Sequence, residues 1–368
     1  MLDEALYGDC RGGTGPVLLM AAGQRIDTAL QLRRLKDAGY SVEMPSMYPR
    51  QTVTASDAAR AGFGPEDGPH REFSSRLRQA IETREALVST AKSLFRRVQE
   101  GALPDMGAIE DATGKLACEV ASDPQAHTAL TYLLRCDDYT VEHSTDVAVL
   151  MAALTSILGL SEEEQRLASL AGLLHDVGKQ GIPEEILTKP GALTKREYDC
   201  IKTHPSLGLE VLSGWDRCPE AVRQVVYQHH ERLDGSGYQQ GLKGDGIHRF
   251  ARIAGVVDSF DAMSARRVYS IGVPPRLALR EIYSHRDVLF DSEPVLALVK
   301  LIGVYPVGTR VLLSTGESGV VSAPNMEDTT RPWVLVDKDR RGRSLDPPFL
   351  LVWRAGDPRI VGTSAEGA

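Results

Sequence analysis

The feature that most constrains this fold is a set of histidines and aspartates at positions where helical periodicity predicts a buried apolar face. Its members are His143, His175, Asp176, His204, His229, His230 and Asp258. His143 precedes Val147 by four residues and Asp258 follows Ala254 by four, so each shares a helix face with apolar side chains. Buried charges and buried imidazoles need partners, because burying them alone costs several kcal/mol. Convergence of the whole set on cations is the most economical explanation.

The residue types indicate which cations these are. A single histidine on an apolar face is more often a hydrogen-bonded core residue, so only the set as a whole carries the argument. Imidazole together with carboxylate favours Fe, Mn, Zn or Ni over Ca. The set also exceeds one tetrahedral site. The sequence therefore predicts at least two metals that share a bridging carboxylate.

The chain has 368 residues, enough for two or three domains, and its patterning changes along its length. For residues 1–104 we predict a regulatory region that consists of a strand–helix–strand element, a linker at 45–70 and a long helix at 71–101. Residues 105–300 are helix-rich, with capping boxes at Ser161–Glu164 and Thr194–Glu197. Residues 301–368 contain short β-branched runs and a tail. We expect a mainly α protein: a helical bundle with a small α/β N-terminal region and a short β-rich C-terminal extension.

The long helix at 71–101 has two interpretations. Its apolar positions recur at helical spacing, from Leu77 through Ile81 to Val98. The stripe either packs against the following domain or forms a coiled segment that makes a homodimer. The run is too short for a heptad pattern to decide between them.

Composition and charge exclude several classes of protein. Apolar residues make up 42% and charged residues 25%, which is ordinary for a globular chain. No apolar run approaches the ~20 residues of a membrane span, and no signal peptide is predicted. The net charge of −8 argues against DNA binding. The five cysteines form no CxxC pair, so neither a disulfide framework nor a zinc ribbon is expected. We expect a cytoplasmic protein.

Two motifs within the helix-rich region resemble a known family. The run His175-Asp176-Val177-Gly178-Lys179 resembles the HDxGK signature of HD phosphohydrolases. The run from His229 to Tyr238, HHERLDGSGY, is similar to the HHExxDGxGYP signature of the HD-GYP subfamily. The resemblance extends over about residues 128–295 and includes Arg252–Ala254 and Val257–Met263. HD-GYP proteins are bacterial cyclic di-GMP phosphodiesterases with a helical-bundle fold, so the resemblance implies an HD-type bundle as the catalytic domain.

The resemblance also implies roles for individual residues. The seven histidines and aspartates match the family's metal ligands, and Asp176 matches a carboxylate that bridges two divalent cations, with Fe favoured and Mn the alternative. Lys179 matches a lysine that contacts the substrate phosphate, and Arg267 aligns with an arginine that binds the dinucleotide. Arg252 is a further candidate for the phosphate site. Asp261 either orients a metal ligand or serves as a cap or ion-pair partner.

The expected reaction is hydrolysis of cyclic di-GMP. A metal-activated hydroxide would attack phosphorus, with Asp176 and Lys179 as catalytic residues, to give pGpG and, after a second cut, GMP. One alternative is a weakly active or inactive cyclic di-GMP-binding module that signals through a protein partner. Another is a hydrolase of a different cyclic dinucleotide.

Three positions depart from the family pattern. Gln239 replaces the proline of the GYP triplet, which puts the order of that loop in question. Tyr139 stands where members with three metals carry a glutamate, so two metals are expected. Ser270 replaces a lysine near the substrate, which predicts weaker phosphate binding.

Overall fold

The computed structural model describes most of the chain from the long helix onward. The described residues are 7–8, 17–18, 69–133, 138–189, 191–264, 273–323, 325, 328–351, 353 and 357–363. By contacts the chain separates into one unit of residues 1–47 with 365–368 and a second of residues 48–364. The boundaries of the three predicted parts stay a prediction. The long helix and Ala323 of the C-terminal part share core clusters with helices of the bundle.

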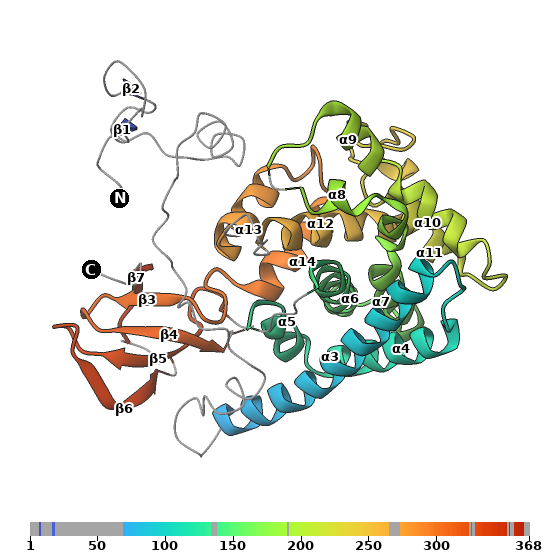
Figure 1. The fold of residues 1–368 in the computed structure, drawn as a ribbon. Helices are drawn as coiled ribbons and strands as arrows, with labels where there is room; N and C mark the ends of the chain where they lie inside the picture. The colour runs from blue at the N-terminus through green and yellow to red at the C-terminus, as the bar shows by residue number, and fades with distance from the viewer. Residues whose placement is uncertain are drawn as a thin grey trace. The chain divides into compact units, whose positions relative to one another are not determined.

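Helices make up most of the second unit, as predicted (Figure 1). They are α3 (Pro69–Gln99), α4 (Met106–Ser122), α5 (Pro124–Leu133), α6 (Tyr139–Ile157), α7 (Glu162–Leu174), α8 (Glu184–Leu187), α9 (Lys195–Ile201), α10 (His204–Leu212), α11 (Glu220–Gln228), α12 (Arg249–Ser264), α13 (Pro275–Ser284) and α14 (Ser292–Ile302), with short 3-10 turns η1 (Val177–Gly181) and η2 (Gly244–Gly246). Both predicted capping boxes are present, at Ser161 before α7 and at Thr194 before α9.

Helix α6 is the central element of the bundle. Its residues from Val141 to Thr155 are buried on every side, as expected of a helix enclosed by others. Helices α3, α4, α5, α7, α12 and α14 all contact it (Figure 1). The carboxylate of Asp138 accepts hydrogen bonds from the N–H groups of Thr140 and Val141, which fixes where α6 begins. His143 therefore enters the core one turn later.

The apolar face of α3 is used within the chain. Leu87, Ala91, Leu94 and Phe95 are buried in the main core together with residues of α4 and α6. This confirms the packing interpretation of the long helix. Homodimerisation through α3 stays a prediction, and any dimer would have to use the residues of α3 that this core leaves exposed.

A buried ion pair joins α3 to α6. Arg84 Nη2 lies 2.8 Å from Asp146 Oδ1, and both side chains are almost fully buried. Burial raises the pKa of the Asp146 carboxyl to about 7, and the Arg84 guanidinium opposes that rise. The Arg84 guanidinium thus favours the ionised Asp146 carboxylate, which burial alone would keep protonated.

We expect Arg84→Met to lower the free energy of unfolding by about 3–5 kcal/mol at pH ~8, because the buried carboxylate loses this cation. The folded-state pKa of Asp146 lies above its usual value of 3.8. Without Arg84 this pKa rises further, above the wild-type value of about 7. The stabilities of the wild type and the variant therefore diverge as pH rises through about 7, where only the wild-type carboxyl ionises, and the defect should be smaller at pH ~5.5. Urea denaturation at both pH values measures it, with the exposed Arg96→Met as the control. A defect of equal size at both pH values would contradict this explanation.

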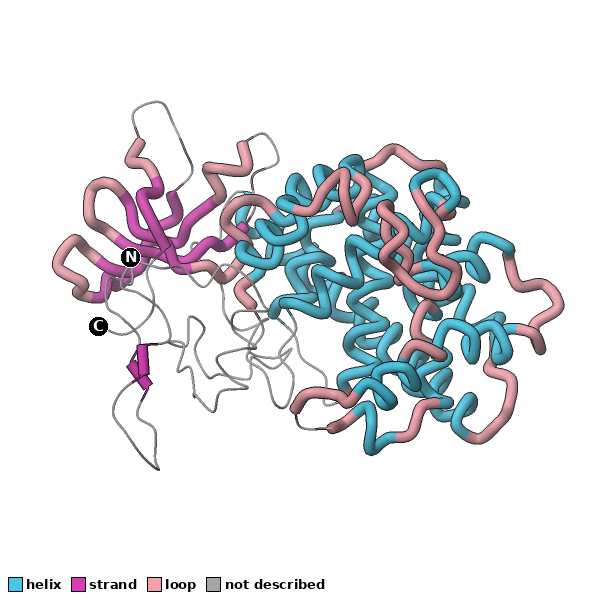
Figure 2. Tube along the Cα trace, turned by 90° about the horizontal axis from the view of Figure 1, so that it is seen from above, coloured by secondary structure: helices cyan, strands magenta, loops and turns pink. Residues whose placement is uncertain are grey.

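The C-terminal part forms the predicted β-rich extension. It is an antiparallel five-stranded sheet in the order β6-β5-β4-β3-β7. Its strands are β3 (Arg310–Leu313), β4 (Ser318–Ala323), β5 (Trp333–Lys338), β6 (Ser344–Leu351) and β7 (Ile360–Thr363). Val311, Val321, Val334 and Val336 form its buried face. Figure 2 shows these strands gathered together.

Little of the predicted N-terminal region is described. Strands β1 (Tyr7–Gly8) and β2 (Val17–Leu18) pair antiparallel. The helix and second strand expected up to residue 44, and the linker up to residue 68, lie outside the described residues. Among the helices described, none combines the length and apolar character that crossing a bilayer demands.

Candidate metal centre

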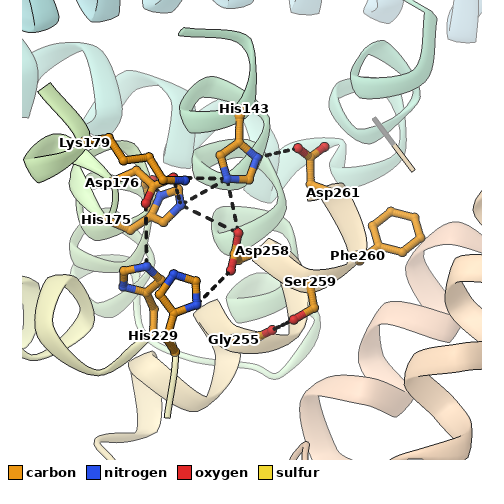
Figure 3. Close-up of polar contacts among 12 residues, drawn as sticks. His143, His175, Asp176, Lys179, His229, Gly255, Asp258, Ser259, Phe260 and Asp261 are labelled. Carbon is orange, nitrogen blue, oxygen red and sulfur yellow. Dashed lines mark hydrogen bonds and ion pairs between the residues drawn. The ribbon is translucent and has the colours of Figure 1, made fainter. Parts of the chain in front are cut away.

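The structure brings all seven predicted side chains together, although they come from separate elements. His143 lies on α6, His175 and Asp176 occupy the junction between α7 and η1, His204 begins α10, His229 and His230 follow α11, and Asp258 lies on α12. All but His230 are buried as residues, and the His230 side chain is 18% exposed. Figure 3 shows five of these side chains pointing toward one another, those of His143, His175, Asp176, His229 and Asp258.

The donor atoms fall into two groups. The first consists of His143, His175 and Asp258, and the second of Asp176, His204, His229 and His230. In the first group, His143 Nε2 lies 3.3 Å from His175 Nε2 and 3.2 Å from Asp258 Oδ1. In the second, His204 Nε2 lies 3.3 Å from His229 Nε2.

Asp176 lies between the groups and faces both. Its Oδ2 is 3.4 Å from His143 Nε2 and 3.2 Å from His175 Nε2. Its Oδ1 is 3.2 Å from His204 Nε2 and 3.7 Å from His229 Nε2. One carboxylate thus offers one oxygen to each group, which is the arrangement expected of a bridging ligand.

The geometry fits metal coordination. Two ligands at ~2.1 Å from one ion are about 3.0–3.4 Å apart at ordinary coordination angles, close to the spacings seen here. His204 and His229 each donate Nδ1–H to backbone carbonyls, so in the neutral ring Nε2 presents a lone pair. Those lone pairs face Asp176 Oδ1, which is buried and accepts no hydrogen bond. Acceptors facing acceptors in a buried site need a cation between them.

The electrostatics favour the metal-binding protonation state at His229, Asp176 and Asp258, but not at His143. Burial lowers the pKa of His229 to about 4, so this imidazole is neutral at pH 7. Burial opposes ionisation of Asp176, but the neighbouring His175 and Lys179 hold the pKa of its carboxyl well below the usual value. His143 helps to hold the pKa of Asp258 low against the effect of burial. A metal site needs neutral imidazoles and ionised carboxylates, because protonated ligands cannot coordinate. Burial opposes protonation of His143, but Tyr139 and the surrounding carboxylates raise the pKa of this imidazole well above its usual value, so a metal bound there would displace a proton.

The predicted substrate-binding cations differ in their surroundings. Lys179 bonds through Nζ to Asp176 Oδ2, and its side chain is 22% exposed (Figure 3). Arg252 lies 3.1 Å from Asp245 and 3.2 Å from Asp291, so two carboxylates compete with any phosphate for its guanidinium. Its assignment to substrate binding stays a prediction. Arg267 and Ser270 lie outside the described residues.

The loop that carries Gln239 is held by side chains instead of by proline. Gln239 Nε2 donates to the carbonyl of Lys202, and Ser206 Oγ donates to Gln239 Oε1 at 3.4 Å. Both partners are two residues from His204. The Glu231 carboxylate accepts from three consecutive backbone N–H groups, those of residues 240–242. The substitution at residue 239 therefore leaves the loop anchored to the segment that supplies His204.

Several neighbours of the cluster were not assigned from sequence. Asp261 Oδ2 lies 2.7 Å from His143 Nδ1, a contact that fits both the predicted orientation of that imidazole and the predicted ion pair. The Tyr139 ring stacks on His143 and the Tyr238 ring on His230. The Tyr139 contact could have been expected from the sequence, because residues four apart on a helix are neighbours. The Tyr238 contact depends on how its loop folds back.

Comparisons with known proteins find similar sequences for much of the chain. A family model described as the HD domain matches residues 122–293. The cyclic di-GMP phosphodiesterase PA4108 of Pseudomonas aeruginosa is 36% identical over 292 residues, which are 78% of this chain and 70% of that protein. The cyclic di-GMP phosphodiesterase response regulator RpfG of Xanthomonas campestris is 37% identical over 227 residues, which are 61% of this chain and 57% of that protein.

A solved structure supports the architecture. Bd1817, a HDG"Y"P protein from Bdellovibrio bacteriovorus, superposes with a TM-score of 0.52 at 18% identity. The match covers 81% of this chain and 93% of that one. At this identity the likeness speaks for the fold, which is the predicted HD-type bundle.

Proposed function

Because this chain belongs to the HD-GYP family of HD-domain proteins, we propose that it is a metal-dependent phosphodiesterase that hydrolyses cyclic di-GMP to pGpG and, in a second cut, to GMP. The observation that carries the proposal is the buried Asp176 carboxylate, whose two oxygens face two separate sets of imidazoles. Relatives named cyclic di-GMP phosphodiesterases support the choice of substrate.

Two divalent cations would be held by the seven clustered side chains. His143, His175 and Asp258 would hold one cation, and His204, His229 and His230 the other, with Asp176 shared. Fe is the favoured ion and Mn the alternative, since both suit mixed imidazole and carboxylate donors. When bound, such ions lower the pKa of a coordinated water toward neutrality and neutralise charge on phosphoryl oxygens.

The protein's own residues would position the substrate and its charge. Lys179 is anchored to Asp176 and partly exposed, so its ammonium can reach a non-bridging phosphate oxygen beside the cluster. His230 is the most exposed of the predicted ligands, and Tyr238 stacks on it at a ring-centroid distance of 4.6 Å. The exposures of Lys179 and His230 mark where a phosphodiester would approach. Backbone carbonyls keep His175, His204 and His229 oriented.

The test is turnover by the full chain loaded with Fe(II) under anaerobic conditions or with Mn(II). We expect cyclic di-GMP to be converted to pGpG, with GMP appearing later, as resolved by chromatography. The same assay with 3′3′-cyclic GMP-AMP tests the alternative dinucleotide, and a chelator-treated sample is the control. Tight binding of cyclic di-GMP without product would favour the binding module. Faster turnover of the mixed dinucleotide would contradict the proposed substrate.

A further inference from the structure

The outer nitrogens of the clustered histidines do not all have the same kind of partner. His175 Nδ1 donates to the Gly172 carbonyl at 2.7 Å. His204 and His229 likewise donate Nδ1 to carbonyls, with shortest distances of 2.7 Å and 3.0 Å. His143 differs, because its Nδ1 lies 2.7 Å from the carboxylate of Asp261 (Figure 3). A carboxylate behind a ligating imidazole makes that imidazole a stronger donor than a carbonyl does.

Asp261 is positioned for this contact by the fold. It lies on α12 one turn after Asp258, and it reaches across to α6 while only 5% exposed. In this buried setting its charge is weakly screened by water. One stretch of α12 therefore supplies a donor carboxylate for the first group and a supporting carboxylate for the imidazole beside it.

The two groups consequently differ in charge. The group of His143 and His175 has Asp258 as a member and Asp261 behind it, with the Lys179 ammonium offsetting one of these charges. The group of His204, His229 and His230 has only imidazoles as members, and among the described residues the nearest carboxylate besides Asp176 is Asp258, whose Oδ2 lies 3.8 Å from His230 Nδ1. Asp176 is shared and cancels from the comparison. The first group thus keeps about one negative charge more than the second.

Resting on the metal centre of the proposed function, we infer that the two metal positions are unequal. The position formed by His143, His175 and Asp258 binds its divalent cation more tightly and fills first, and Asp261 is the positioning residue that causes the difference. Asp261→Asn keeps an oxygen acceptor for His143 Nδ1 and removes only the charge, so it isolates this effect.

Calorimetric titration of the metal-stripped full chain with Mn(II) tests the inference without substrate. We expect two binding events in the wild type. Asp261→Asn should weaken the tighter event by ~10–100-fold and leave the weaker one within about twofold, in line with mutations of other supporting carboxylates. Asp261→Glu, which restores the charge, should recover much of the loss. The matched control is Asp245→Asn, since that carboxylate is exposed and lies outside the cluster.

His230→Gln assigns the events, because it should weaken only the second. A single class of sites in the wild type would overturn the inference. It would also fail if Asp261→Asn acted on the weaker event, if it changed neither affinity, or if Asp261→Glu behaved like Asp261→Asn. If the protein binds metal as inferred but does not hydrolyse cyclic di-GMP, the proposed function is contradicted and this inference still holds.

Discussion

Asp176→Asn is expected to fold and to lose both bound metal and phosphodiesterase activity. The substitution keeps the shape of the side chain but removes the charge that both groups of imidazoles share. Altering a supporting carboxylate costs ~10–100-fold in metal affinity, so removing a shared ligand should cost more than about a hundredfold. Metal analysis of the purified variant and turnover of cyclic di-GMP at saturating Mn(II) measure the two losses.

A close control is available on the surface. Asp199 and Lys202 form an ion pair with the same three-residue separation as Asp176 and Lys179, but the Asp199 side chain is 49% exposed. Asp199→Asn should therefore leave metal content and turnover unchanged. An Asp176→Asn protein with full metal content and full turnover would exclude Asp176 as the bridging ligand.

Helical periodicity was sufficient to predict that the cluster is buried. The spacing from His143 to Val147 and from Ala254 to Asp258 places each polar residue on an apolar face, and the structure buries both. Local capping signals were equally reliable, as Ser161 and Thr194 show, because both halves of a capping box lie within four residues. Predictions that depend on neighbours along one element therefore held.

Apart from the convergence of the seven predicted ligands, contacts between particular distant residues could not be predicted. The contact of Asp261 with His143 joins residues 118 positions apart. Arg252 appeared free to bind phosphate because nothing local reveals that Asp291, on the loop before α14, pairs with it. The apolar stripe of α3 indicates that this face packs against another surface. Periodicity does not say whether that surface belongs to the same chain or to a second copy.

The tertiary structure explains why Gly178, the glycine of the HDxGK signature, has no room for a side chain. A Cβ atom at Gly178 would lie 2.0 Å from the His204 carbonyl oxygen and 2.3 Å from the Gly208 backbone nitrogen. These neighbours are backbone atoms of α10, so no side chain can rotate away. The close approach of η1 to α10 brings the segment of Asp176 and Lys179 against the segment of His204.

We therefore expect Gly178→Ala to separate η1 from α10 and to displace His204 from Asp176. Overpacking typically costs ~1–3 kcal/mol, and this contact between backbones should reach or exceed the upper end. Thermal unfolding and metal content of the purified protein measure the effect. The matched control is Gly181→Ala in the same turn, where the nearest atom is the end of the flexible Leu207 side chain at 3.1 Å. If the two alanine variants lost stability and metal equally, the close approach at Gly178 would not be what holds the two ligand segments together.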